Sequence, residues 1–258
     1  MALRKWGKVP QLDSLGLPGA IPGMLTSPSG LILVVGGTGS GKSTTLASCI
    51  DYINRAREAH ILTLEAPIEY IHTQIKCRIR QRLIGPGKDC STFADGITAA
   101  MREDPDVIMV GEVRDKATMS ACLAAAQTGH LVMGTLHTNS AAEAVERALS
   151  FFPEGERDLA RSILSNVLRA VIAQRLLPGL SSSKRVLACE VMVVTPGIRA
   201  NISNGEIVQI EQAMESGLRE GQRTMNHALL ELYRSQDISR ETALMASPRR
   251  DILERRMS

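Results

Sequence analysis

The chain has 258 residues, of which 44% are hydrophobic and 22% are charged, so it can bury a sizeable core as one α/β domain with a helical part or as two small domains. Its formal net charge of +3 argues against a protein that coats nucleic acid, although a local basic patch is compatible with it. The longest apolar runs have the length of strands, which excludes a membrane-spanning helix of about 20 apolar residues. Five cysteines without C-x-x-C spacing indicate reduced thiols rather than a zinc site.

Proline and glycine recur through the first part of the chain, up to residue 29. Such a composition predicts a linker or strap rather than a domain of its own. The first long apolar run follows directly, so we expect the folded core to begin at residue 30.

Five apolar residues, Leu31–Val35, lead into the glycine-rich segment GGTGSGKSTT. Gly36, Gly41, Lys42 and Ser43 satisfy the phosphate-binding pattern G-x-x-x-x-G-K-[ST]. Glycines let backbone N–H groups turn toward phosphate oxygens, and the positive end of the following helix favours the same anion. Lys42 can reach the terminal phosphates, and the Ser43 hydroxyl is placed to bind Mg²⁺. The segment predicts a nucleotide site with Mg²⁺, formed by Gly36, Gly37, Thr38, Gly39, Ser40, Gly41, Lys42, Ser43 and Thr44.

Strand-like and helix-like patterns alternate from this loop onward. Apolar β-type runs occur at 31–35, 61–64, 107–110, 131–135 and 186–194. Helix-period patterns lie at 43–57, 93–101, 115–128 and 140–150, the last with Ser140 as its N-cap. Continuous apolar strands that alternate with helices indicate a parallel sheet covered on both faces. We therefore predict an α/β nucleotide-binding core over residues 30–200.

Beyond Pro153 the pattern becomes mainly helical. Apolar residues at helical spacing from Leu159 to Leu176 predict one helix of about five turns. The charge-rich end of the chain, from Ser247 onward, is expected to be frayed or loosely docked. A helical C-terminal subdomain is predicted over 201–258, with helices at 208–217, 224–235 and 239–246.

Acidic residues follow two of the predicted strands. Glu65 and Glu69 come after the second strand, where a carboxylate can hold Mg²⁺ through water or polarise the attacking water. Glu112 follows the third strand, with Gly111 in the position that an aspartate often occupies. Its best role is to orient or activate the water that attacks the γ-phosphate. The alternative for each carboxylate is a solvated acid at the end of a strand.

Two histidines bracket the fourth predicted strand, with His130 before it and His137 just after Thr135. A lone histidine is more often structural, but this pair beside a nucleotide site favours a sensor of the γ-phosphate. Metal ligation is the weaker interpretation, because no carboxylate or cysteine lies at ligand spacing.

Arginines form the last group of candidates. Arg78, Arg80 and Arg82 alternate, so they face one side of an extended segment, whereas Arg102 and Arg114 stand singly. An arginine that neutralises transition-state charge is expected in ring NTPases and is often supplied by a neighbouring subunit. Arg82, Arg102 and Arg114 are the candidates for this role, and a solvated basic face is the alternative.

Four strings occur in order along the chain: VVGGTGSGKSTT, HILTLEAPIEY, REDPDVIMVGEVRD and TGHLVMGTLHTNSA. Together they resemble the secretion/pilus ATPase superfamily, nearest the twitching-motility (type IV pilus retraction) ATPases of PilT and PilU type. The resemblance runs from about Leu15 to about Ala246. It implies a RecA-like P-loop NTPase that converts Mg²⁺-dependent ATP hydrolysis into mechanical work. It also implies that Glu69 and Glu112 are the two catalytic glutamates and that His137 belongs to the family's histidine motif.

The resemblance further implies where and with what this motor works. The expected function is ATP-driven disassembly, or retraction, of a type IV pilus at the inner-membrane platform. The expected location is the cytoplasmic face of that membrane. Expected partners are further copies of the chain in a hexamer, the platform protein and a second motor ATPase, and no nucleic acid is expected.

Three departures from the family pattern leave alternatives open. Ala66 stands where the E-D-P-x-E motif has an aspartate, and the motif that marks retraction motors is altered at 197–202. The family's N-terminal PAS-like domain is expected to be missing, with only its connecting strap at residues 1–29. The alternatives are a type IV secretion or conjugation ATPase, and a weakly active nucleotide-binding partner that regulates a full-length motor. A small-molecule P-loop kinase is disfavoured, because the sequence offers neither an arginine lid nor an acceptor site.

Overall fold

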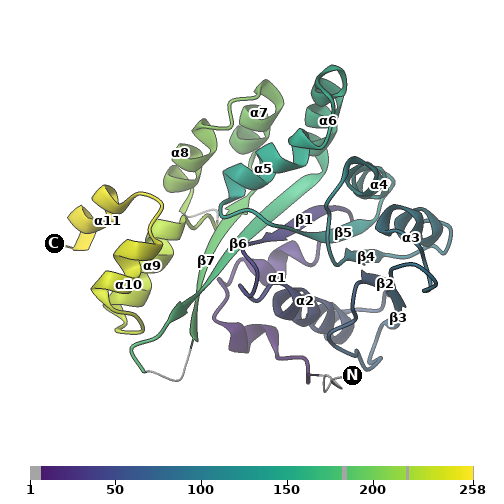
Figure 1. Cartoon of the computed structure of the whole chain (residues 1–258), viewed down its shortest axis with the longest axis horizontal. Helices are drawn as coiled ribbons and strands as arrows, with labels where there is room; N and C mark the ends of the chain where they lie inside the picture. The colour runs from purple at the N-terminus through teal and green to yellow at the C-terminus, as the bar shows by residue number, and fades with distance from the viewer. Residues whose placement is uncertain (1–6, 182–184, 219–220, 258) are drawn as a thin grey trace.

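A seven-stranded sheet forms the centre of the protein, with its strands in the order β3-β2-β4-β5-β1-β6-β7 (Figure 1). The computed structural model describes residues 7–181, 185–218 and 221–257. The strands are β1 (Gly30–Val35), β2 (His60–Glu65), β3 (Arg78–Leu83), β4 (Val107–Val110), β5 (Leu131–Leu136), β6 (Leu168–Pro178) and β7 (Arg185–Val193). Neighbouring strands are parallel, except that β6 and β7 form an antiparallel pair. The predicted α/β fold with a mostly parallel sheet is confirmed.

Helices cover both faces of this sheet, because its central strands are apolar on both sides. The helices of the core are η1 (Leu12–Leu15), α1 (Ile21–Met24), α2 (Lys42–Ala56), α3 (Phe93–Ala100), α4 (Lys116–Gln127), α5 (Ala141–Ser150), α6 (Glu154–Val167), α7 (Pro196–Asn204) and α8 (Gln209–Ser216). In β1, Leu31, Leu33 and Val35 pack with α3–α8, whereas Ile32 and Val34 pack with η1, α1 and α2 (Figure 1). The resulting layers place every loop that follows a parallel strand at one edge of the sheet.

Polar N-caps fix where several helices begin. The predicted cap Ser140 accepts a hydrogen bond from the backbone N–H of Glu143 at 3.2 Å, and α5 starts there. Thr92 caps α3 and Asp115 caps α4 in the same way. Each cap satisfies a donor that the N-terminus of a helix otherwise leaves free. The helices predicted at 43–57, 93–101, 115–128 and 140–150 are confirmed to within about two residues.

The predicted helix from Leu159 to Leu176 is wrong over its second half. α6 stops short of that end, and the chain continues as β6 from Leu168. Alternate residues of β6 are buried in the apolar clusters on the two faces of the sheet, so β6 carries a near-continuous apolar run. Apolar residues at a spacing of four fit one face of a strand as well as one face of a helix. The β-branched pair Val171 and Ile172 favours the strand.

The C-terminal helices form an apolar cluster of their own on the β6–β7 hairpin (Figure 1). They are α9 (Met225–Arg234), α10 (Arg240–Ala246) and α11 (Arg250–Met257). Their buried side chains pack with Leu177 of β6 and Ala188 of β7. The expectation of a frayed or loosely docked chain end is wrong up to residue 257, because α11 buries Leu253 completely in this cluster.

The described part of the predicted strap lies along α2. Leu12, Ile21 and Leu25 are buried in one apolar cluster with that helix. The Ser48 hydroxyl of α2 donates to the carbonyl oxygen of Pro10 at 2.8 Å. The limits of strap, core and helical subdomain stay predictions.

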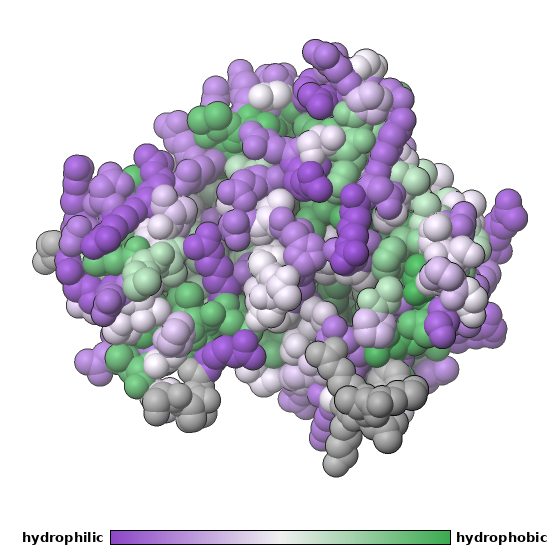
Figure 2. Space-filling view, viewed as in Figure 1, coloured by the Kyte–Doolittle hydropathy of each residue, from purple (hydrophilic) through white to green (hydrophobic). Residues whose placement is uncertain are grey.

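The surface carries scattered apolar side chains. On the face shown in Figure 2, hydrophilic and apolar residues are interspersed. The large apolar side chains that are most exposed come from separate parts of the chain: Ile71, Ile75, Leu159, Leu180, Val208, Leu218 and Met245. Among the helices of the described residues, none combines the length and apolar character that crossing a bilayer requires.

Candidate active site

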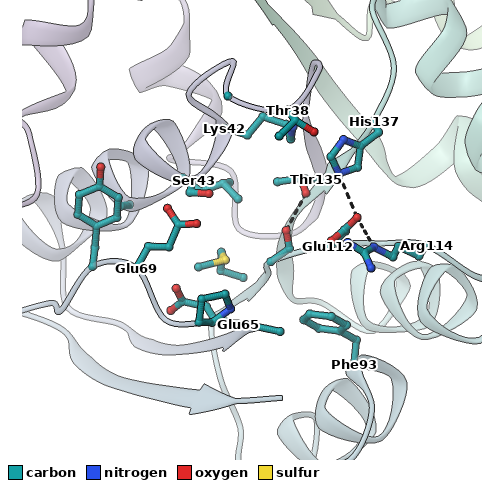
Figure 3. A pocket seen from close by; sticks show the side chains of 18 of the residues that line it. Thr38, Lys42, Ser43, Glu65, Glu69, Phe93, Glu112, Arg114, Thr135 and His137 are labelled. Carbon is teal, nitrogen blue, oxygen red and sulfur yellow. Dashed lines mark hydrogen bonds and ion pairs between the residues drawn. The ribbon is translucent and has the colours of Figure 1, made fainter. Parts of the chain in front are cut away.

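The loops after β1, β2, β4 and β5 line one cavity of about 310 Å³ (Figure 3). Parallel strands bring their carboxyl ends to one edge, which is where open α/β sheets bind ligands. The cavity brings together most of the residues that the sequence singled out, namely Thr38, Gly39, Lys42, Ser43, Glu65, Glu69, Glu112, Arg114 and His137. They come from four separate stretches of the chain, and the strand order makes them neighbours.

The phosphate loop adopts backbone conformations that require glycine. Gly41 has a φ of 92°, in the left-handed region, and Gly36 has a φ of 152°. A Cβ atom on Gly36 would come within 2.5 Å of both the Gln174 carbonyl oxygen and Ser40 Oγ. Gly36 is therefore fixed by the close approach of β6 as well as by its own turn.

The loop ends at the N-terminus of α2, which is an anion-binding position. Among the described residues no side chain caps this helix, so its first N–H groups lack that kind of partner. The Lys42 ammonium donates to the carbonyl oxygens of Gly36 and Gly37 at 2.8 and 2.9 Å. Burial lowers the pKa of Lys42, and the charge of Glu112 opposes that shift. Uncapped N–H groups, a helix dipole and a lysine together fit a phosphate group.

Glu65 and Glu69 occupy different environments at the end of β2. Glu65 is buried, and its Oε1 accepts hydrogen bonds from Thr63 Oγ1 at 2.7 Å and from Gln81 Nε2 at 3.0 Å. Burial raises the pKa of Glu65, and these hydrogen bonds oppose the shift. Glu69 is exposed and lines the cavity together with Ser43 (Figure 3). Glu69 is therefore the better placed of the two to touch a ligand, whereas Glu65 is held in the cavity wall.

Glu112 lies just beyond β4 and is shared by two partners. Its Oε1 forms an ion pair with Arg114 Nε and lies 3.0 Å from His137 Nε2 (Figure 3). The Glu112 side chain is 19% exposed, whereas Arg114 and His137 are 73% and 47% exposed. β4 and β5 are adjacent in the sheet, so their ends bring the predicted base and the predicted sensor into direct contact.

An aspartate is frequent at the position that Gly111 occupies. Here the residue is a glycine, because β2 passes close to it. A Cβ atom there would lie 3.1 Å from the Leu64 carbonyl oxygen and 3.4 Å from Cα of Glu65. The Gly111 N–H donates to the same Leu64 carbonyl at 2.7 Å, and the Gly111 carbonyl accepts from Thr135 Oγ1 at 2.7 Å. The ends of β2, β4 and β5 are thus joined by hydrogen bonds, and the acidic side chain comes one residue later, at Glu112.

Gly111→Asp is expected to lower the free energy of unfolding by about 1–3 kcal/mol, because the new side chain must displace the backbone of β2. Urea unfolding followed by circular dichroism measures this change. Gly155→Ala is the matched control, since an added Cβ atom meets nothing within 4 Å there. In helix α6 that alanine should leave stability unchanged or raise it. An unchanged free energy of unfolding in Gly111→Asp would contradict this prediction and show that the β2 backbone can shift without cost.

Three of the four sensor and arginine candidates do not line the cavity of their own chain. His130 precedes β5, whose six residues separate it by about 20 Å from the edge that His137 occupies. Its Nδ1 lies 2.9 Å from the Ala125 carbonyl oxygen, so its contacts are those of a structural histidine. Arg82 pairs with Glu103 at 2.5 Å, and Arg102 is exposed in the turn before β4. Of the four sensor and arginine candidates, only Arg114 lines the cavity of its own chain.

Two aromatic side chains, Tyr70 and Phe93, line the cavity and are not among the predicted site residues. Tyr70 OH and Thr44 Oγ1 lie 2.9 Å apart, which connects the loop after β2 to α2 next to Ser43. Phe93, the first residue of α3, lines the opposite wall (Figure 3). For Tyr70 the signal is its place at the end of the string HILTLEAPIEY, directly after Glu69, whereas Phe93 has no signal beyond the rarity of aromatic residues, which make up 3% of the chain.

Oxygen ligands that suit Mg²⁺ are present in the cavity, but they are few. They are Ser43, Glu65, Glu69 and Glu112. Among the described residues, no group of three or more His, Cys, Asp or Glu side chains forms a metal-binding cluster. Mg²⁺ typically takes one or two protein ligands and completes its coordination with phosphates and water. The residues therefore fit a Mg²⁺ ion that arrives with a nucleotide rather than one bound alone.

Comparison with known proteins relates the chain to secretion and pilus proteins. Residues 18–254 match the family of type II/IV secretion system proteins. The chain is 45% identical to the twitching motility protein of Neisseria gonorrhoeae, over 90% of its own length and 62% of that protein. It is 43% identical to the type IV pilus retraction ATPase PilT of Pseudomonas aeruginosa, over 92% and 68% of the two lengths. The chain thus spans about two thirds of the length of these relatives.

Solved structures share the whole arrangement. The crystal structure of the pilus retraction motor PilT with bound ADP matches with a TM-score of 0.89 at 44% identity, covering 96% of this chain and 69% of that one. The ATPase DotB of Legionella pneumophila matches with a TM-score of 0.83 at 32% identity, covering 92% and 66%. Because both matches cover nearly all of this chain, they include the C-terminal helices as well as the sheet.

Proposed function

The chain belongs to the family of type II/IV secretion system proteins, and from this we propose that it is a Mg²⁺-dependent ATPase that drives the disassembly, or retraction, of a type IV pilus. The observation that carries the proposal is the single cavity in which Lys42, Ser43, Glu69, Glu112 and His137 meet. It combines a phosphate-binding loop with carboxylates at the place where an attacking water would stand. The bound ADP of the similar PilT structure supports a nucleotide at this edge of the sheet.

In this proposal the phosphate loop binds the β- and γ-phosphates of ATP. The uncapped N–H groups of α2 and the Lys42 ammonium donate to phosphate oxygens. Lys42 then exchanges the carbonyl oxygens of Gly36 and Gly37 for phosphate oxygens. Ser43 would hold Mg²⁺ directly and Glu65 would hold it through water, and the ion when bound neutralises phosphate charge.

Glu112 is proposed to orient the attacking water and to accept its proton, with Glu69 as the second catalytic carboxylate. The contacts with Arg114 and His137 hold the Glu112 carboxylate at the edge of the cavity. His137 is proposed to respond to the γ-phosphate, and its contact with Glu112 from the neighbouring strand end supports this role. The Arg114 side chain is 73% exposed. In this proposal it reaches the phosphoryl group that is transferred, in its own subunit or in the neighbouring one, and stabilises its charge.

The pilus setting is proposed from the relatives, two of which are named for twitching motility or pilus retraction. We propose that copies of the chain form a hexamer at the cytoplasmic face of the inner membrane and act there on the pilus platform protein. A second motor ATPase is a further proposed partner, and Arg82 and Arg102 stay candidates for contributions between subunits. The match to the family of type II/IV secretion system proteins keeps a secretion ATPase as the second candidate. Ala66 in the cavity wall keeps a weakly active regulatory partner as the third.

ATPase activity measured together with mass in solution tests the proposal. We expect phosphate release that requires Mg²⁺, a shift to six-subunit mass when ATP is added, and no change of rate with DNA. Clear stimulation by DNA would favour a secretion or conjugation ATPase. Tight ATP binding without turnover would favour the regulatory partner, and absence of ATP binding would overturn the nucleotide site itself.

A further inference from the structure

One buried carboxylate outside the cavity contacts two helices at once. Glu190 lies on β7 and is 6% exposed. Its Oε1 accepts a hydrogen bond from the Ala141 N–H at 2.7 Å, and its Oε2 accepts one from the Met225 N–H at 3.1 Å. Ala141 is the first residue of α5, and Met225 is the first residue of α9. A single side chain therefore binds the N-termini of two helices that are far apart in sequence.

Neither helix needs Glu190 in order to begin. Ser140 caps α5 and Thr224 caps α9, each by accepting a hydrogen bond from the N–H three residues further on. Glu190 takes N–H groups that these caps leave free, and its charge lies at the positive ends of two helix dipoles. Burial raises the pKa of Glu190, and the two backbone hydrogen bonds oppose that shift. A buried carboxylate is costly to maintain, so its position between two capped helices indicates a role beyond capping.

The first of these helices is directly connected to the cavity. Only four residues, 137–140, separate β5 from α5, and the first of them is His137, which contacts Glu112. The Glu143 carboxylate of α5 accepts a hydrogen bond from the Asn139 N–H at 2.8 Å, which fastens this short segment to the helix. His137 is therefore joined to the N-terminus of α5 by a short segment that is hydrogen-bonded to the helix.

The second helix belongs to the C-terminal cluster. α9, α10 and α11 share one apolar cluster with Leu177 and Ala188 of the β6–β7 hairpin. Arg175 of β6 donates to the Ala246 carbonyl oxygen at the end of α10 at 2.6 Å. Ala188 and Glu190 are two residues apart on β7, so they lie on the same face of the strand. The C-terminal helices are thus attached to the β6–β7 hairpin as one unit. Glu190 lies where this unit meets α5.

We infer that Glu190 is a positioning residue that couples the loop carrying His137 to the C-terminal helices. When the nucleotide changes the position of His137, α5 moves, and the carboxylate passes this movement to α9 because it is hydrogen-bonded to both helices. The inference rests on the proposed function, in which His137 responds to the γ-phosphate. It makes α9–α11 the part of the chain whose position reports the nucleotide state.

Hydrogen–deuterium exchange of the full chain tests this coupling, with a slowly hydrolysed ATP analogue as the probe. In the unmodified chain the analogue should slow exchange in the first turns of both α5 and α9. Glu190→Gln keeps the size of the side chain but presents an NH₂ group to one N–H donor. This variant should still bind the analogue and respond in α5, but should lose the response in α9. Exchange at the start of α9 should rise by about tenfold with and without the analogue.

Thr224→Ala is the matched control, because it removes the ordinary cap of α9 and leaves the carboxylate bridge in place. Its α9 exchange should rise while the response to the analogue persists. Glu190→Asp keeps the charge on a shorter side chain, and it should give a reduced α9 response if the glutamine variant does not fold. A full α9 response in either Glu190 variant would overturn the coupling. An unmodified chain that binds the analogue without any α9 response would also overturn it, whereas failure to bind would refute the proposed function.

Discussion

ATP turnover is expected to fall by about 10²-fold or more in Lys42→Ala, with nucleotide binding weakened or abolished. The Lys42 ammonium now satisfies the carbonyl oxygens of Gly36 and Gly37. Without it, those two carbonyl dipoles and the nearby charge of Glu112 remain to face the phosphates, and all three repel an anion. Calorimetric titration with ADP and ATP measures binding, and phosphate release measures turnover.

Lys116→Ala is the matched control for this loss of one positive charge. Lys116 starts α4 and pairs on the surface with Glu156 at 2.7 Å, and it does not line the cavity. Exposed pairs of this kind contribute about 0–1 kcal/mol, so stability, binding and turnover should all stay close to those of the unmodified chain. Normal turnover in Lys42→Ala, or an equal loss in Lys116→Ala, would refute the assignment of the phosphate loop.

The phosphate loop could be predicted from the sequence because its chemistry is local. The left-handed turn at Gly41, the start of α2 and the position of Lys42 depend on consecutive residues. The parallel strands β1, β2, β4 and β5 could be predicted as apolar runs because parallel strands that are covered on both faces are apolar along their length. β7, which is antiparallel to β6, carries an apolar run as well. The motif order then supported a family, and the family match over residues 18–254 bears it out.

Contacts between strand ends could not be predicted, because they depend on strand order. No spacing in the sequence places His137 against Glu112, or shows that Leu64 leaves no room for a side chain at Gly111. His130 is a different case, because His130 and His137 stand at opposite ends of β5, and that distance follows from their spacing in the sequence.

The errors in the C-terminal half have a different physical cause. β6 was mistaken for a helix because a strand buried on both faces has no alternation. The charge of α11 is typical of a frayed end, yet Leu253 and Met257 pack in the apolar cluster of α9 and α10, and Glu254 pairs with Arg240 of α10 at 2.8 Å. Glu190 carried no signal at all, since its two partners are backbone N–H groups.

Glu112→Gln is expected to preserve nucleotide binding and to lower turnover by about 10²-fold or more. The amide has the shape of the carboxylate but cannot accept a proton from water. The ion pair with Arg114 and the contact with His137 weaken as well, but both partners are largely exposed, so stability should change little. Calorimetric titration should give a dissociation constant for ATP close to that of the unmodified chain, while phosphate release is slow.

Glu156→Gln serves as the control for Glu112→Gln, because it neutralises a surface glutamate whose partner is Lys116 and should leave turnover unchanged.

Glu69→Gln then separates the two catalytic candidates. Glu69 lines the cavity with Ser43, the proposed direct Mg²⁺ ligand, so loss of its negative charge should raise the Mg²⁺ concentration needed for half-maximal turnover as well as lower the rate. Glu112→Gln should lower the rate and leave the Mg²⁺ dependence as it is, since Glu112 is held by Arg114 and His137. If instead Glu69→Gln alone removes turnover and Glu112→Gln retains it, the base is Glu69, and the contact between Glu112 and His137 serves to position the loop before α5.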